Sequence, residues 1–116
     1  MLIFVLLVLS VISFRATHQN EKRPAIAAPR VAFVRITEDG FSPAALKINA
    51  GTEVVWTNSD TEIHSIEAAI GSKYPSLNSN TNLDTNGTYR YTFDQKGKYN
   101  YHDKLNPTMN GSVTVE

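Results

Sequence analysis

Cysteine is absent from this chain of 116 residues. Its absence excludes disulfide bridges, thiol nucleophiles, iron–sulfur clusters and every metal site that needs a thiolate. A net charge is also lacking, because eleven basic residues balance eleven acidic ones. Since no basic run is present either, we expect no nucleic-acid partner. The length is that of one domain with a single core.

A long apolar run occurs only at the N-terminus. Residues 1–14 read MLIFVLLVLSVISF, interrupted only by Ser10 and Ser13. The run is shorter than the roughly 20 residues that span a bilayer, but it has the length of a signal-peptide core. No Lys or Arg precedes it and no small-residue cleavage site follows closely. A cleaved signal peptide and a retained membrane anchor therefore both remain open, with a buried helix of the domain as a third reading.

Both of the first two readings predict export, to the periplasm or the cell surface. A retained anchor would place residues 1–14 in contact with the membrane. Residues 15–30 are polar and then rich in Ala and Pro, which is typical of a linker.

Residues 31–116 consist of short runs rich in Val, Ile, Thr, Tyr and Phe, separated by Gly, Asn, Asp and Pro. Such a pattern predicts an all-β domain, an antiparallel sandwich or barrel. We expect strands at residues 31–37, 45–49, 53–58, 64–68, 88–93, 98–102 and 112–116. Successive side chains of a strand alternate between its faces, so one face of each strand should be apolar. The expected core residues are Leu46, Ile48, Val54, Trp56, Tyr89, Tyr91, Phe93, Tyr99 and Tyr101.

The segment from Gly71 to Gly87 is dominated by Ser, Asn, Thr and Gly and is too polar to be expected in the core. We interpret it as a long surface loop. It is either a solvated crossover between two sheets or the place where a protein partner of the cell envelope binds.

Two groups of motifs resemble the plastocyanin-like cupredoxins, the blue-copper family. In the first group, residues 40–43 read GFSP, 46–48 read LKI, 51–60 read GTEVVWTNSD and 64–66 read HSI. In the second, residues 97–111 read GKYNYHDKLNPTMNG, similar to the loop that closes the copper site in that family. The resemblance covers residues 31–116 and implies a cupredoxin fold, an antiparallel Greek-key β-sandwich or barrel.

The resemblance also assigns the four copper-ligand positions. The family's first histidine corresponds to His64, its cysteine to Asp103, its second histidine to Asn106 and its axial methionine to Met109. Blue copper needs two histidines and a thiolate. Two of the four ligands are therefore missing, and we expect a degenerate site with no cofactor, or with only weakly bound Cu(II) or another divalent metal.

Three roles for Asp103 remain open. By strand alternation its carboxylate should point inward, and a buried carboxylate needs partners. It can accept backbone N–H groups near Leu105 and Asn106, pair with a protonated His64, or bind a metal together with His64, helped by Asn106 or Met109. The ion pair predicts a raised pKa for His64. His102 should face the opposite way from Asp103, as an exposed strand histidine.

No catalytic constellation is present, so we do not expect an enzyme. The remaining classes are a non-redox binding or structural module of the cell envelope, and a copper-binding or electron-transfer protein with a rewired site. The missing ligands favour the first class.

Overall fold

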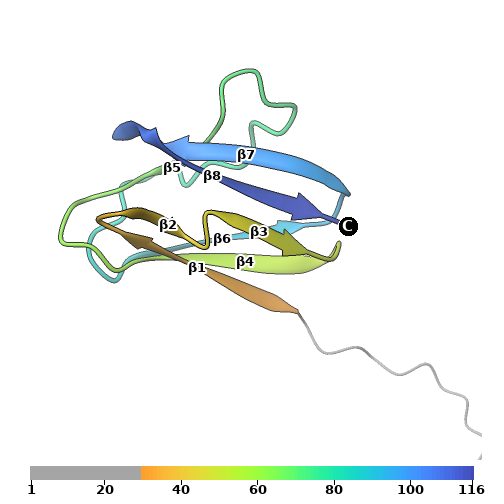
Figure 1. Cartoon of the computed structure of the whole chain (residues 1–116), viewed down its shortest axis with the longest axis horizontal. Coiled ribbons are helices and arrows are strands. Elements are labelled where there is room, and N and C mark those ends of the chain that lie inside the picture. Colours follow the sequence, from red (N-terminus) through yellow and green to blue (C-terminus); the bar gives the residue numbers. More distant parts are fainter. Residues whose placement is uncertain (1–29) are drawn as a thin grey trace, which may run out of the picture.

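The computed structural model describes residues 30–116, which form two facing four-stranded sheets (Figure 1). One sheet has the order β2-β1-β4-β6 and the other the order β3-β8-β7-β5. The predicted all-β sandwich is confirmed. Within residues 30–116, no helix is long and apolar enough to cross a membrane. The expectations for residues 1–29 lie outside the described residues.

The bounds of the strands, in chain order, are β1 (Val31–Thr37), β2 (Gly40–Ser42), β3 (Ala45–Ile48), β4 (Thr52–Asn58), β5 (Ile66–Ala68), β6 (Thr88–Phe93), β7 (Gly97–Asp103) and β8 (Asn106–Val115).

The two sheets are mixed rather than wholly antiparallel. β1 pairs with β4, and β3 with β8, in the parallel direction, whereas the other neighbouring strands are antiparallel. Alternation in a sequence encodes which face of a strand is buried but not the direction of its neighbour. The prediction of a purely antiparallel sandwich was therefore wrong in this respect.

Apart from shifts of one residue at several strand ends, the strands differ from the expected ones in three places. The short β2 was not predicted, β5 begins at Ile66 instead of His64, and β8 begins at Asn106 instead of Ser112. The early start of β8 comes from the antiparallel pairing of β7 and β8, which ends with Asp103 opposite Asn106. Backbone pairing thus extends the hairpin through residues whose polar character predicts a loop.

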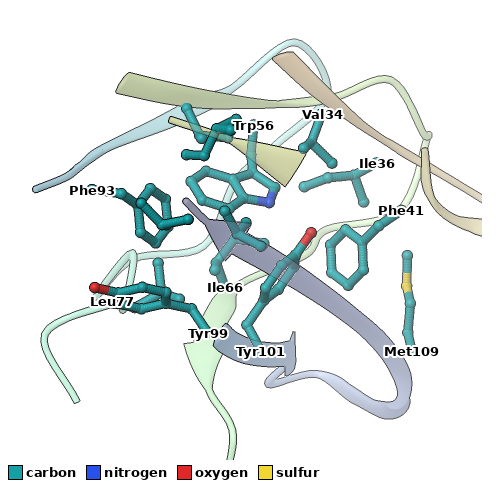
Figure 2. Close-up of a cluster of buried hydrophobic side chains, with 14 of the residues drawn as sticks. Val34, Ile36, Phe41, Trp56, Ile66, Leu77, Phe93, Tyr99, Tyr101 and Met109 are labelled. Atoms are coloured by element: carbon teal, nitrogen blue, oxygen red, sulfur yellow. The ribbon is translucent and has the colours of Figure 1, made fainter. Parts of the chain in front are cut away.

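The inner faces of the two sheets meet in an aromatic core (Figure 2). Trp56 and Tyr101 are almost completely buried and cross edge-to-face, with ring centroids 5.4 Å apart. Phe41 packs against the other side of Tyr101, at 4.8 Å. Such aromatic pairs contribute about 1 kcal/mol each beyond their burial. The predicted core faces are confirmed, with Leu46, Tyr89 and Tyr91 packing half-buried against the cluster.

The segment between β5 and β6 is less solvated than its composition predicts. Leu77 and Leu83 within it are fully or almost fully buried in the core. The backbones of His64 and Leu83 also exchange two hydrogen bonds, of 3.2 and 2.7 Å. The prediction that this segment contributes nothing to the core was wrong, because two isolated leucines in a polar sequence are enough to anchor it.

Candidate functional site

The candidate site lies at the end of the sandwich where β7 turns into β8, opposite the C-terminus (Figure 1). His64 comes from the connection between β4 and β5, and Asp103 is the last residue of β7. β5 pairs with β7 so that Ile66 lies opposite Asp103. This register brings the residues before β5 beside the end of β7, and so brings His64 to Asp103.

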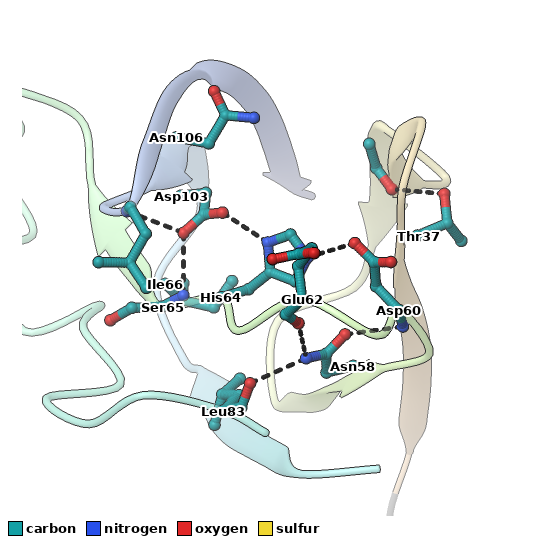
Figure 3. A network of polar contacts seen from close by, with 12 residues as sticks. Thr37, Asn58, Asp60, Glu62, His64, Ser65, Ile66, Leu83, Asp103 and Asn106 are labelled. Carbon is teal, nitrogen blue, oxygen red and sulfur yellow. Dashed lines mark hydrogen bonds and ion pairs between the residues drawn. The ribbon is translucent and has the colours of Figure 1, made fainter. Parts of the chain in front are cut away.

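Asp103 is fully buried and uses both carboxylate oxygens (Figure 3). Its Oδ2 accepts a hydrogen bond from His64 Nδ1 at 2.6 Å. Its Oδ1 accepts the backbone N–H groups of Ser65, at 2.9 Å, and Leu105, at 3.0 Å. Two of the three roles expected for Asp103, the backbone cap and the pairing with His64, are therefore present together.

A second carboxylate, that of Asp60, holds the other ring nitrogen of His64. His64 Nε2 donates to Asp60 Oδ2 at 2.8 Å, and Asp60 is 9% exposed. Asp60 was not predicted as a site residue, although it lies in the motif that carries the family resemblance. Its position four residues before His64 indicates proximity only in a helix, and this segment is not helical.

Asn58, the last residue of β4, fixes the position of Asp60 (Figure 3). Its side-chain oxygen accepts the backbone N–H of Asp60 at 2.8 Å. Its amide nitrogen donates to the carbonyl groups of Glu62 and Leu83, each at 2.8 Å. Since Asn58 is completely buried, the segment that carries Asp60 and His64 is held by three internal hydrogen bonds.

The two carboxylates together set the charge of His64. A neutral imidazole donates from only one ring nitrogen, whereas both nitrogens of His64 face carboxylate oxygens, so this arrangement favours the imidazolium form. Burial opposes the charge, but the hydrogen bonds to Asp103 and Asp60 outweigh it and raise the pKa of His64 above its ordinary value. The raised pKa predicted from the ion pair is confirmed in direction. Conversely, the hydrogen bond from His64 lowers the pKa of Asp60.

The other two predicted positions line the same pocket as His64, and neither is a hydrogen-bond partner of its ring. Asn106 is exposed, and its Oδ1 accepts a hydrogen bond from Thr108 Oγ1 at 2.9 Å, within its own strand. Met109 is 9% exposed and belongs to the apolar core, at the edge beside Phe41 (Figure 2).

An open pocket of about 640 Å³ lies over the site. All four predicted ligand positions line it, together with Asp60, two further acidic residues and two apolar ones. The complete lining consists of Glu38, Asp60, Thr61, Glu62, Ile63, His64, Asp103, Leu105, Asn106 and Met109.

These residues do not fit a blue-copper ion. The chain has no cysteine, and an imidazolium has no lone pair with which to bind a metal. Freeing a ring nitrogen of His64 would require the loss of a proton and of the bond to Asp103 or Asp60. Across residues 30–116, no group of three or more His, Cys, Asp or Glu side chains is placed to hold a metal ion.

His102 lies apart from this site, as its position in β7 predicts. It is nevertheless buried, with 9% exposure, and its Nε2 donates to Glu67 Oε2 at 2.9 Å. The expectation of an exposed strand histidine was therefore wrong. The carboxylate of Glu67, on the neighbouring strand β5, provides the polar partner that makes burial of the ring tolerable.

Known proteins resemble this chain in both sequence and structure. The profile of the cupredoxin-like domain family matches residues 2–115. Amicyanin-alpha of Methylorubrum extorquens is 31% identical over 83 residues, which cover 72% of this chain and 70% of the relative. A purple cupredoxin from Nitrosopumilus maritimus superimposes with a TM-score of 0.66 at 29% identity, covering 73% of this chain and 99% of that one.

Amicyanin from Paracoccus versutus has the same TM-score of 0.66, at 26% identity, and the match covers 82% of this chain and 86% of amicyanin. The family profile spans nearly the whole sequence, and the strands build the sandwich that these relatives share. This chain therefore belongs to the cupredoxin-like domain family.

Proposed function

We propose that this protein is a cupredoxin-like binding module without a blue-copper centre, and that it recognises a protein partner without carrying out redox chemistry or catalysis. The observation that supports this most directly is that both ring nitrogens of His64 are bonded to carboxylates. In this arrangement a proton occupies the ring nitrogen whose lone pair a metal ion would need.

The residues that precede the domain support a proposal for where this binding module acts. The apolar residues 1–14 and the polar linker at 15–30 favour export, with the domain held at the cell envelope. The domain would then meet its partner in the periplasm or at the cell surface.

A second candidate function is copper binding through His64 and Asp103. Amicyanin has been solved in a Cu(I) form, at 26% identity to this chain, and His64 and Asp103 line the same open pocket as Met109. Imidazole and carboxylate are ligands that Cu(II) accepts, and Cu(II) binds such sets more tightly than other first-row divalent ions. This function requires the metal to displace the proton of His64.

Titration of the full chain with Cu(II), followed by calorimetry and electron paramagnetic resonance, distinguishes the two candidates. We expect only weak binding, unchanged in His64→Ala and in Asp103→Ala, because the two carboxylates hold the ring in its protonated form. His102→Ala serves as the matched control for adventitious binding at a histidine outside the site. One-to-one binding that both site substitutions abolish would instead establish a carboxylate-ligated copper protein.

A further inference from the structure

Two exposed apolar side chains flank the pocket over His64. Ile63 is 46% exposed and Leu105 is 51% exposed, and both line the pocket. They come from different segments, the connection between β4 and β5 and the turn between β7 and β8. Apolar side chains that converge on one depression with a polar rim are typical of a surface that binds another molecule.

The charge of this surface is acidic. Glu38, Glu62, Asp60 and Asp103 line the pocket, and no Lys or Arg does. His64 is the one cation in the lining, and its charge is already shared between Asp60 and Asp103. Glu38 and Glu62 are exposed and form no ion pair with any described residue, so their charges are available to a cationic ligand.

Other exposed apolar residues lack this combination. Ile70 is 98% exposed in the segment between β5 and β6, and the pockets beside it contain Lys73 and Lys98 but only one carboxylate, that of Glu67. Phe33 is 64% exposed on β1 and lines neither the pocket over His64 nor the two beside Ile70. As the docking site for a partner, the structure thus favours the pocket over His64. The sequence had suggested the segment from Gly71 to Gly87 instead.

We propose that this surface, formed by Glu38, Asp60, Glu62, Ile63 and Leu105, docks a basic and apolar segment of a partner protein. A Lys or Arg side chain of the partner enters the pocket beside Glu38 and Glu62, and its apolar neighbours cover Ile63 and Leu105. This inference rests on the proposed function, since a copper ion bound at His64 in place of the proton would make the pocket less acidic and would occupy part of it. The same acidic charge repels nucleic acid and anionic membranes.

Binding of synthetic peptides to the full chain tests this proposal. The probe is a fluorescein-labelled peptide of alternating Lys and Leu, and the two comparison peptides replace Lys with Glu or Leu with Ser. We expect fluorescence anisotropy to detect saturable binding of the Lys–Leu peptide alone, weakening as the salt concentration rises.

Two double variants locate the interaction. Glu38→Gln with Glu62→Gln removes exposed charge, and Ile63→Ser with Leu105→Ser removes exposed apolar surface. We expect each pair to weaken binding about tenfold or more, as residues central to an interface do. Asp94→Asn and Ile70→Ser, which are also exposed but lie outside this surface, are the matched controls and should leave the affinity unchanged.

Three results would overturn the docking proposal: equal binding of the Glu–Leu peptide, equal loss in the control variants, or binding to vesicles of anionic lipid in place of the peptide. A Cu(II) titration of the same preparation separates this failure from that of the proposed function. Tight copper binding at His64 would refute the metal-free module whatever the peptide does. Absence of peptide binding together with weak copper binding would refute only the proposal that the partner segment is basic and apolar. The metal-free module would stand.

Discussion

A histidine with one carboxylate on each ring nitrogen is the central feature of this site. His64 is 6% exposed, so its charge has little contact with water and depends on Asp60 and Asp103. Removing one member of a buried ion pair costs more than the pair contributes, because an uncompensated charge remains buried.

Asp103→Asn should therefore destabilise the domain strongly. The amide keeps an oxygen that can accept the backbone N–H groups of Ser65 and Leu105, so the substitution removes mainly the charge that faces His64. We expect the free energy of unfolding at pH 6 to fall by about 3 kcal/mol. Urea denaturation followed by circular dichroism measures this change.

Asp84→Asn is the matched control, because Asp84 is exposed and forms no ion pair with any side chain of residues 30–116. It should change the stability by less than about 0.5 kcal/mol. Equal stability of Asp103→Asn and the natural chain would mean that the bond to His64 contributes nothing.

The family resemblance placed His64, Asp103, Asn106 and Met109 around one pocket, and the structure brings all four there. Which of them interact was not predictable from the motif. The contact of Asp60 with His64 depends on how Asn58 folds the end of β4, and this tertiary hydrogen bonding leaves no pattern in the sequence.

The hairpin of β7 and β8 carries Asp103 of the site and also a close packing contact. Gly111 lies opposite Tyr101 in the ladder, and a Cβ atom at Gly111 would come within 2.4 Å of the Tyr101 ring. The ring cannot move away, because Phe41 and Trp56 pack against it.

Gly111→Ala should accordingly destabilise the domain by about 2 kcal/mol or more, the cost of overpacking a core. Thermal or urea unfolding measures it. In a Tyr101→Leu background the same substitution should cost much less, because the atoms that clash are gone. Equal costs in the two backgrounds would show that the clash with Tyr101 is not the cause.

Strand alternation predicted the inner faces of β4, β6 and β7, whose members are buried or half-buried, but it did not predict that Val55 and His102 on the other faces of β4 and β7 are buried as well. It did not predict the parallel pairs or the early start of β8, which arise from contacts between strands distant in sequence. Leu77 and Leu83 were missed for a similar reason, since a single buried leucine has no periodicity.

The stability of the whole domain should depend on pH through His64 and Asp60. The pKa of His64 is raised above 6.5, so its contribution is complete below pH 6.5 and is lost as the pH rises through the folded-state pKa. The pKa of Asp60 is lowered below 3.8, so its contribution is complete above pH 3.8 and is lost as the pH falls through the folded-state pKa. We expect the greatest stability between these two values.

Urea midpoints measured from pH 3 to pH 9 test this dependence. His64→Gln should remove the alkaline decline, because glutamine does not titrate, and should leave a nearly flat profile above pH 6.5. A natural chain whose midpoint stays constant from pH 6 to pH 9 would contradict the charged state of His64.

The loops at this end of the sandwich are held together by hydrogen bonds and ion pairs of the chain's own side chains. Asp103 joins the segment before β5 to the turn after β7, and His64 joins Asp103 to Asp60. What this network takes up from water is a proton, on the ring of His64. If the domain is the metal-free module proposed above, it completes its fold without a metal-delivery protein and independently of the metal supply of the cell.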